Sequence, residues 1–163
     1  MTLALDDRDI QILQILSREG RISKTELARR INLSPTPCWE RMKRLEEAGL
    51  IRGYRAEIAL SAFSRHVTVF VTAELESHRV HDFERFERAV ARHDGIVGCW
   101  ALGGGFDYLL QVVQPDIDSY QRMMDDLLSA EAGLKRYFTY VVTKEVKTGG
   151  VPPLAHMLDP QKD

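Results

Sequence analysis

Residue types that bind phosphates and base edges are concentrated between Ser34 and Arg52. Ser34 and Thr36 carry hydroxyl groups, Lys43 an ammonium group and Arg44 a guanidinium group. All of these groups can donate hydrogen bonds to the backbone or the bases of DNA. The segment therefore predicts a DNA-binding surface. Its candidate residues are Lys24, Ser34, Pro35, Thr36, Trp39, Glu40, Lys43, Arg44 and Arg52.

Trp39 has two interpretations on the sequence alone. Its ring can pack on a deoxyribose or on a thymine methyl group of bound DNA. It can equally be a half-buried residue that packs the helix against its own domain. Both interpretations remain open at this point.

A second group of candidate binding residues surrounds three consecutive glycines, residues 103–105. Their backbone N–H groups can face a carboxylate. Asp107 can meet an ammonium group, and Leu102 and Tyr108 can supply an apolar wall. Together these groups fit an α-amino acid. The alternative is a β-hairpin turn that needs glycine for its backbone conformation, and the residues alone do not exclude it.

No other cluster predicts catalysis or metal binding. Cys38 and Cys99 lie in apolar patterns, which favours reduced, buried thiols. His78 and His81 have helical spacing but no third ligand nearby, so a solvated surface is the better interpretation. There is no Ser/His/Asp or Cys/His arrangement and no G-x-x-x-x-G-K-[ST] motif. We therefore predict no catalytic residue, no metal site and no cofactor.

The composition is that of a folded protein with one large domain or two small ones. The chain has 163 residues, of which 44% are hydrophobic. No apolar run reaches the roughly 18 residues of a membrane span. The opening MTLALDDRD becomes acidic too early for a signal peptide. We therefore expect a cytoplasmic protein without a membrane partner.

The small net charge of −2 hides an asymmetry between the two halves of the chain. Residues 18–55 hold ten Lys/Arg and five Asp/Glu, a balance of +5, whereas residues 67–163 hold ten and fifteen, a balance of −5. A local positive charge is expected where one domain meets a polyanion. A three-helix protein-binding module is the alternative, but the basic surplus on the outward face favours DNA.

Three short helices are predicted in the first third of the chain. Asp6 or Asp7 can cap the first, which is predicted to end at Gly20. Residues 23–26 (SKTE) match a capping box for the second. Asn32-Leu33 is predicted to form the turn before the third helix. Apolar residues at helical spacing predict the buried faces: Ile10, Leu13 and Leu16, then Leu27, Ala28 and Ile31.

The third helix is predicted to begin after Ser34 as N-cap, with Pro35 at its first position. Gly49 is its expected C-terminal cap. Residues 51–58 then predict a short strand pair or wing. At about 100° per residue, one face of this helix is buried and the opposite face is polar. The buried face holds Cys38, Met42 and Leu45, and the polar face holds Thr36, Glu40, Lys43 and Glu47.

Beyond a linker at residues 59–66 the pattern changes to strands and helices. Residues 67–75 alternate, with Val67, Val69, Val71, Ala73 and Leu75 on one side. Further strands are predicted at 96–102, 106–114 and 137–146. Helices are predicted at 79–92 and after Asp116. Val80, Phe83, Phe86 and Val90 are expected to point inward in the first of these helices, and Ile117, Tyr120, Met124 and Leu127 in the second. The order βαββαβ is that of a ferredoxin-like fold.

Two separate motifs now resemble one known family. The run GRIS…ELARRINLSPTPCWERMKRLEEAGLIRGY resembles the DNA-binding half of the Lrp/AsnC regulators. Residues 104–110 (GGFDYLL) and 139–147 (TYVVTKEVK) resemble the second half, so the resemblance covers about residues 5–147. One position departs: Gly105 stands where the family commonly has Asp. This removes a possible contact to a ligand ammonium group and bears on which amino acid is bound.

The resemblance implies that the second half senses amino acids and dimerises through its sheet. Phe70, Trp100, Leu102 and Tyr140 are apolar residues opposite the core positions, as an interface requires. Dimers, and tetramers or octamers built from them, would present paired recognition helices to a pseudo-palindromic operator. The implied effector-binding residues are Leu102, Gly103, Gly104, Gly105, Phe106, Asp107, Tyr108 and Tyr140.

The sequence thus predicts an α+β protein, a winged helix-turn-helix domain followed by a ferredoxin-like domain. We expect these at residues 1–58 and 67–147, with a linker at 59–66 and a tail at 148–163. The predicted function is sequence-specific DNA binding that responds to an amino acid or related effector. Two alternatives remain. An architectural DNA-binding protein without effector is favoured by Gly105, and an enzyme has no supporting motif.

Overall fold

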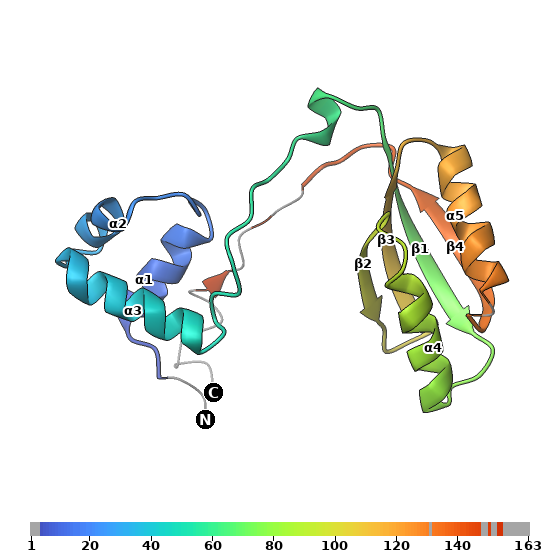
Figure 1. The fold of residues 1–163 in the computed structure, drawn as a ribbon, viewed down its shortest axis with the longest axis horizontal. Coiled ribbons are helices and arrows are strands. Elements are labelled where there is room, and N and C mark those ends of the chain that lie inside the picture. Colours follow the sequence, from blue (N-terminus) through green and yellow to red (C-terminus); the bar gives the residue numbers. More distant parts are fainter. Residues whose placement is uncertain (1–3, 131, 148–149, 151–152, 155–163) are drawn as a thin grey trace. The chain divides into compact units, whose positions relative to one another are not determined.

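A computed structural model describes residues 4–130, 132–147, 150 and 153–154 of the chain (Figure 1). The chain divides into two compact units, Met1–Ile58 with Lys147–Asp163, and Ala59–Val146. Residues 59–66, predicted as a linker, group with the second unit and include a short 3₁₀ helix, η1 (Leu60–Ala62). The predicted tail, residues 148–163, lies outside the described residues except for 150, 153 and 154.

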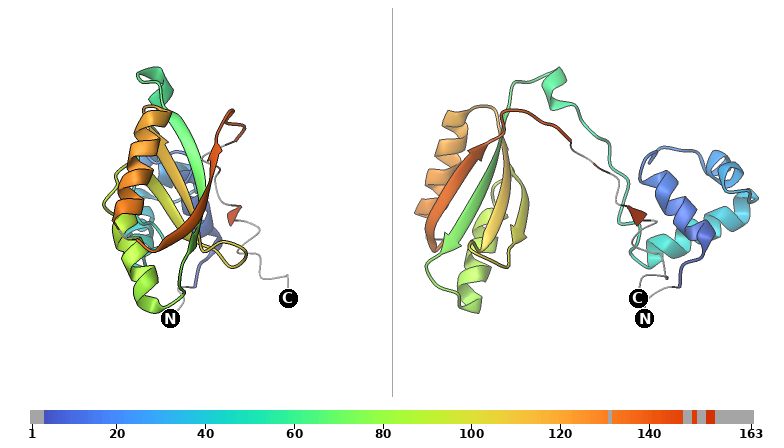
Figure 2. Two further views of the ribbon diagram at one scale, coloured as in Figure 1. Left: turned by 90° about the vertical axis from the view of Figure 1, so that its right-hand side faces the viewer. Right: turned by 180° about the vertical axis from the view of Figure 1, so that it is seen from behind.

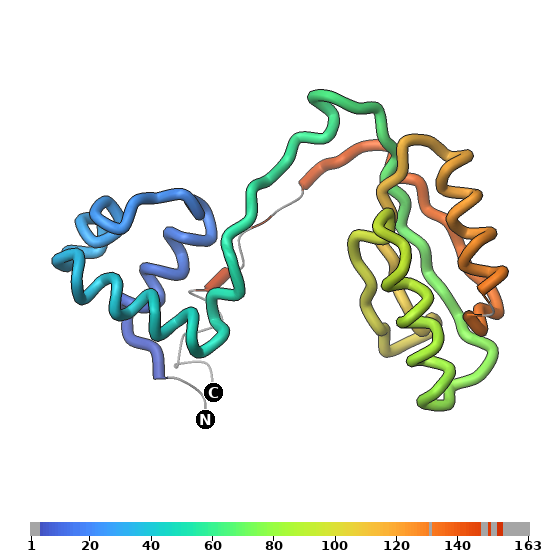
Figure 3. The backbone as a smooth tube through the Cα atoms, in the orientation of Figure 1, coloured from blue at the N-terminus to red at the C-terminus, as the bar shows by residue number. Residues whose placement is uncertain are grey.

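Three helices form the first unit: α1 (Asp7–Leu16), α2 (Lys24–Arg30) and α3 (Pro35–Glu47). Figure 3 traces their backbone and the short loops between them. Their apolar stripes meet in one core. Cys38, Met42 and Leu45 lie in it as predicted, as do Leu27, Ala28 and Ile31.

In α1 the predicted buried face was incomplete. Ile12 is the fully buried apolar residue, while Leu13 and Leu16 are partly buried against the core. Asp9, one turn before Ile12, is also fully buried. A carboxylate is not expected in a core unless it is paired, so the apolar pattern alone could not show that Asp9 belongs to this face.

The helix ends of the first unit follow local chemistry with three differences. Asp6 caps α1 in a capping box with Asp9. The helix ends at Leu16 with Ser17 as C-cap, before the predicted Gly20. Ser23 caps α2 through its hydroxyl, but the Glu26 carboxylate binds Arg29 and Arg30 instead of completing the box. Ser34 is the N-cap of α3 by backbone geometry, without a side-chain hydrogen bond.

The end of α3 and the turn before it use left-handed backbone. Asn32 has φ of 53°, which makes the turn between α2 and α3. Gly49 has φ of 71°, and the Leu50 N–H donates to the Leu45 carbonyl at 3.0 Å, as in a Schellman cap. Asn32 thus makes the tight turn of a helix-turn-helix, and Gly49 ends its second helix.

Residues 51–58 are all described, and none of them lies in a strand. The predicted strand pair does not form in the protomer, because a strand needs a hydrogen-bonded partner and the sheet pairs only β1–β4. The segment is instead attached to α3 by Tyr54, whose hydroxyl donates to Glu46 Oε1 at 2.8 Å. Burial, together with this carboxylate, raises the pKa of Tyr54 to about 12.

The second unit is a four-stranded antiparallel sheet in the order β2-β3-β1-β4. Its strands are β1 (Val67–Leu75), β2 (Ile96–Ala101), β3 (Tyr108–Gln114) and β4 (Leu134–Val141). Helices α4 (Val80–Val90) and α5 (Ile117–Ser129) lie on one face (Figures 1 and 2). This is the predicted βαββαβ arrangement, and its core lies between that face and the helices.

The central strand has the predicted alternation. Val69, Val71, Ala73 and Leu75 are buried beneath the helices, and Val67 is partly buried there. Asp116 caps α5 by accepting the Ser119 N–H at 2.7 Å, as predicted. The other face of the sheet carries no helix (Figure 2). Apolar side chains that alternate with the helix-facing ones, among them Trp100 and Tyr140, remain exposed.

Three predictions for this unit were wrong in detail. β4 covers 134–141 instead of 137–146, because it pairs only with β1 and therefore extends only from Leu75 to Val69 of that partner. Val80 is 75% exposed, since it lies about 90° from the stripe of Phe83, Phe86 and Val90. Ile117, the first residue of α5, is also exposed.

Candidate functional site

The first turn of α3 presents a stiff N-terminus. Pro35 and Pro37 occupy its first and third positions, and neither has an N–H group. Thr36 is therefore the only one of the first three residues of α3 that has a backbone N–H group to donate. Ser34 and Thr36 are exposed, so their hydroxyl groups and this N–H can reach an external acceptor such as a phosphate.

Trp39 brings the two lysines of the predicted site together. The Lys24 ammonium nitrogen lies 5.4 Å from the ring centroid and that of Lys43 5.7 Å, both within cation–π range. Lys24 is the first residue of α2 and Lys43 lies in the middle of α3. The ring is 44% exposed, so Trp39 forms part of an external surface that carries positive charge.

Lys43 also has an anionic neighbour. Its ammonium group lies 3.6 Å from Glu47 Oε1, one turn further along the helix. Both side chains are exposed, and such a pair contributes little to stability. Glu40 is exposed on the same helix.

Arg44 is held by a residue that the sequence analysis missed. Its Nη2 donates to Oδ2 of Asp9 from α1. Arg41 donates through Nη1 to Oδ1 of Asp9 at 2.9 Å and to Oδ2 of Asp6 at 2.6 Å. The signal for Asp9 was its position three residues before Ile12, on the buried face of α1.

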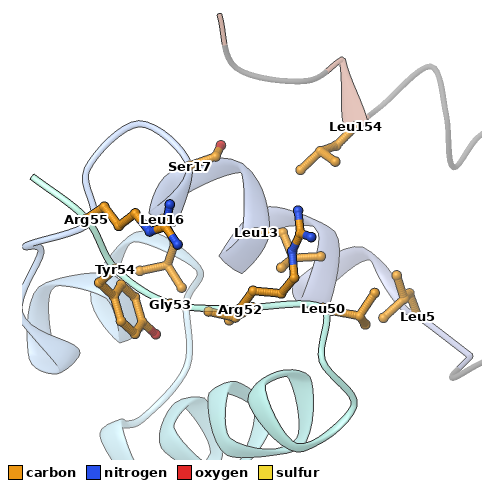
Figure 4. A pocket seen from close by; sticks show the side chains of 11 residues that line it. Leu5, Leu13, Leu16, Ser17, Leu50, Arg52, Gly53, Tyr54, Arg55 and Leu154 are labelled. Atoms are coloured by element: carbon orange, nitrogen blue, oxygen red, sulfur yellow. The ribbon is translucent and has the colours of Figure 1, made fainter. Parts of the chain in front are cut away.

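Arg52 lies away from the lysine pair, beside an apolar groove of about 630 Å³ on the first unit (Figure 4). Leu13 and Leu50 are among its neighbours there, and Leu154 also lines the groove. Arg52 follows α3 in the chain and lines this groove, so it is not part of the cluster formed by Trp39 and the two lysines. Its role in DNA binding stays a prediction.

The glycine loop connects β2 to β3 and is closed by one backbone hydrogen bond. The Leu102 N–H donates to the Asp107 carbonyl at 2.8 Å. None of the three glycines has a left-handed φ, and a Cβ on any of them would meet no atom within 4 Å. The turn itself therefore does not require glycine in this protomer.

Aromatic residues continue from the loop onto the open sheet face. Phe106 contacts Phe138 edge to face, with ring centroids 5.6 Å apart. Tyr140 lies opposite Phe70 in the β1–β4 register and is 53% exposed. Leu102 and Trp100 are also exposed. The structure thus brings Phe106 beside Phe138, two residues before Tyr140 on β4.

The side chains of Asp107 and Tyr108 contact residues of β1, α4 and the connection between them instead of the open sheet face. The Asp107 carboxylate accepts the Leu75 N–H at 2.7 Å and lies 3.0 Å from His78 Nε2. Tyr108 is buried against Phe86, and its hydroxyl donates to Glu87 Oε1 at 2.8 Å. Burial and this carboxylate raise the pKa of Tyr108. In the protomer, Tyr108 is a core residue and Asp107 stabilises the strand ends.

The remaining candidate chemistry is limited. Cys38 is buried as predicted, and burial raises the pKa of its thiol, but Cys99 is exposed because β2 is an edge strand. Within the described residues no group of three His, Cys, Asp or Glu side chains could hold a metal ion. No helix of the described chain is both long enough and apolar enough to cross a membrane.

Two protein-family models match the chain, one for each unit. Residues 5–52 match a winged helix-turn-helix DNA-binding model, and residues 68–152 match the Lrp/AsnC ligand-binding domain.

Among characterised proteins, the transcriptional regulatory protein DoeX of Halomonas elongata is 48% identical over 145 residues, which are 89% of this chain and 92% of DoeX. The leucine-responsive regulatory protein of Escherichia coli is 41% identical over 143 residues, 88% of this chain and 87% of that protein.

Solved structures agree with this assignment. A transcriptional regulator of Neisseria meningitidis in complex with L-Met superposes with a TM-score of 0.88 at 34% identity, over 95% of this chain and all of the other. An AsnC family regulator of Agrobacterium tumefaciens gives 0.87 at 31% identity, over 94% of this chain and all of the other.

Proposed function

Because this chain belongs to the Lrp/AsnC family of transcriptional regulators, we propose that its effector is an α-amino acid bound beside the Gly103–Gly105 loop where subunits meet. The chain is a transcriptional regulator with a helix-turn-helix DNA-binding domain and an amino-acid-binding domain, in a family that is not enzymatic.

The glycine loop carries this proposal. Within the protomer, neither the turn geometry nor a neighbouring atom requires glycine at residues 103–105. We infer that a molecule outside the protomer requires the absence of side chains there. A ligand or a second subunit that approaches the backbone closely supplies such a requirement. The L-Met bound to the Neisseria relative supports an amino acid in this role.

The charges near the loop bear on which amino acid is bound. Gly105 supplies no carboxylate, and that of Asp107 already accepts the Leu75 N–H and faces His78. We expect the ammonium group of the effector to be met by the Asp107 carboxylate in addition to its Leu75 contact, and the loop N–H groups to face the effector carboxylate.

The proposed DNA surface centres on Ser34, Thr36, Trp39 and the two lysines beside the ring. Hydroxyl groups, an N-terminal amide and paired ammonium groups provide the contacts that position a helix on phosphates and read base edges. The exposure of Trp39 supports its packing on DNA more than its packing within the domain.

We further propose that the open sheet face pairs with a second copy of the chain. Trp100, Phe138 and Tyr140 are exposed and alternate along their strands with residues that face the helices, and Leu102 is exposed directly after β2. Apolar patches of this kind usually mark interfaces. A two-fold dimer, or a tetramer or octamer of such dimers, would present pairs of α3 helices to a pseudo-palindromic operator. We assign this action to the cytoplasm, because its target is operator DNA.

The second candidate is an architectural protein that coats DNA without an effector, and Gly105 is the observation that favours it. The two functions differ in sequence preference. A specific operator is bound about 10³-fold or more tighter than random DNA, whereas a packaging protein shows little preference.

A fluorescence-anisotropy titration separates the two. The protein is titrated on DNA from just upstream of its own gene and on a scrambled duplex of equal length, at one salt concentration, with and without a pool of amino acids. Preference for the first duplex that the pool alters supports the effector-responsive regulator. Equal binding to both duplexes with no effect of the pool supports the architectural protein, and Gly105→Asp then tests whether the missing carboxylate is the cause.

A further inference from the structure

One buried anion contacts the recognition helix from another element. Asp9 of α1 is fully buried, and Asp82 is the other buried charged side chain among the described residues. Asp9 accepts three hydrogen bonds, from the Asp6 N–H at 3.1 Å, from Arg41 Nη1 at 2.9 Å and from Arg44 Nη2. Both guanidinium groups come from α3.

The pairing matters because the Asp9 carboxylate is fully buried. An ionised group in a protein interior is tolerated only with charged partners and hydrogen bonds. If Arg44 moves away from Asp9, the buried carboxylate loses one of its two guanidinium partners, which is energetically unfavourable. By contrast, the Lys43–Glu47 pair on the same helix is exposed at 3.6 Å, so it can open at little cost.

Arg44 is nevertheless not hidden. Its side chain is 44% exposed, and a guanidinium group has five N–H donors, of which Asp9 takes one. The group is therefore presented in one orientation. It can serve a phosphate or base that stands at that position, but it cannot follow phosphates as the protein moves along DNA.

From this geometry we infer that Asp9 is a positioning residue that restrains Arg44 and so suppresses non-specific DNA binding. Non-specific affinity comes from counterion release and rises with the number of mobile cations that reach phosphates. By holding Arg44, Asp9 lowers that number, while Lys43, whose contact to Glu47 is exposed and opens at little cost, can still reach phosphates. The ratio of specific to non-specific affinity increases as a result. This inference rests on the proposed DNA surface of α3.

The test compares two alanine variants of neighbouring cations on a random-sequence duplex across a range of salt concentrations. Lys43→Ala is expected to flatten the plot of log affinity against log salt by about one unit per DNA-bound protomer. On this random-sequence duplex, Arg44→Ala is expected to leave that slope unchanged, because Asp9 holds the guanidinium group, and to weaken binding only to an operator that places a phosphate or base against the held group. Equal flattening by both variants would show that Arg44 is as mobile as Lys43 and would overturn the inference.

A variant that releases Arg44 from Asp9 should change non-specific DNA affinity in the opposite direction. Asp9→Asn is expected to bind random DNA more tightly, with a slope steeper by about one unit per protomer, and Arg44→Ala in that background should remove the gain. Glu84→Gln on α4 makes the same change in net charge far from α3 in sequence and should alter neither quantity. A purely structural role for Asp9 predicts only loss of binding, in parallel with unfolding.

Each remaining outcome is decisive. If Asp9→Asn binds random DNA no more tightly than the parent while urea unfolding shows it folded, the inference is wrong. If Asp9→Asn does not fold, the comparison of Lys43→Ala with Arg44→Ala still decides. If the parent protein binds no DNA at low salt, the DNA-binding assignment itself is wrong. That result is distinct from a failure of the inference about Asp9.

Discussion

At the scale of single residues, the partner of a side chain decides what its chemistry can do. Asp107 has the right type and place in sequence to bind an effector ammonium group. In the fold its carboxylate accepts the Leu75 N–H where β1 ends and faces His78, with only 17% of the side chain exposed. It therefore has a structural task whether or not it also meets the effector.

Replacing Asp107 separates these tasks. Asp107→Ala should lower the free energy of unfolding of the second unit by about 1–3 kcal/mol, because the Leu75 N–H loses its acceptor. It should also abolish the effector response while effector-free DNA binding remains. Asp107→Asn keeps an oxygen acceptor without the charge, so it should retain most of the stability. Urea unfolding and DNA titration with effector measure both effects.

If Asp107→Asn responds normally to the effector, the charge has no part in binding and the predicted contact to an ammonium group is wrong. Loss of effector-free DNA binding in a folded variant would instead mark the loop as structural.

At the scale of elements, local chemistry at the helix ends decides where the first unit begins and turns. Asp6 caps α1, and the Asp9 backbone N–H followed by Arg41 holds the pKa of Asp6 below its ordinary value of 3.8. Gly49 ends α3 with a left-handed φ that other residues adopt only under strain. Both features lie in contiguous sequence, and both were predicted from it.

The cap of α1 predicts how stability depends on pH. Because the folded pKa of Asp6 is lowered, its contribution is present above about pH 3.8 and is lost as the pH falls through the folded value. Asp6→Ala should cost about 1 kcal/mol at pH 6. The difference from the parent should shrink at pH 3. Urea unfolding followed by Trp39 fluorescence in a Trp100→Phe background measures it, and a difference independent of pH would contradict this account.

Two glycine substitutions distinguish a required glycine from a permitted one. Gly49→Ala should destabilise the first unit by about 1 kcal/mol, although nothing lies within 4 Å of the new Cβ, because its φ is 71°. Gly103→Ala should leave stability unchanged, because its φ is not left-handed and its Cβ would also be free. Loss of the effector response in a stable Gly103→Ala protein would support close approach of a ligand or subunit.

Destabilisation by Gly103→Ala equal to that by Gly49→Ala would restore the simple hairpin-turn interpretation of the loop. Thermal unfolding of the two variants beside the parent is sufficient to decide.

At the scale of the whole molecule, one face of the sheet stays uncovered in the protomer. The other face of the β2-β3-β1-β4 sheet is covered by α4 and α5 (Figure 2). The aromatic side chains of Trp100, Phe138 and Tyr140, which alternate with helix-facing residues, are exposed. The family and the uncovered face are consistent with an oligomer.

A charge on the open face should therefore dissociate the dimer. Tyr140→Arg places a cation opposite Phe70, where a second copy would bury it unpaired. Light scattering should show a smaller particle, and operator affinity should fall because only one recognition helix engages at a time. Val80→Arg is the matched control, at an exposed position on α4. If both variants have the parent's mass, the open face is not the interface.

What the sequence by itself determined about this protein is what depends on neighbouring residues. Spacing and caps predicted α2, α3 and their tight turn, the Gly49 cap, the alternation of β1 and the order of the ferredoxin-like elements, because hydrophobic periodicity and capping act over a few residues. The motifs in the same stretches were enough to predict the family, whereas the DNA surface around Lys24, Trp39 and Lys43 stays a prediction.

The tertiary structure alone decided what depends on partners distant in sequence. The extent of β4 follows from the length of β1, and the exposure of Cys99 from the place of β2 at the sheet edge. Tyr108 turns to Glu87 and Asp107 to Leu75 across the fold. Asp9 is buried because two arginines more than 30 residues away neutralise it. Such pairings leave no local pattern, since their energy appears only when the elements pack.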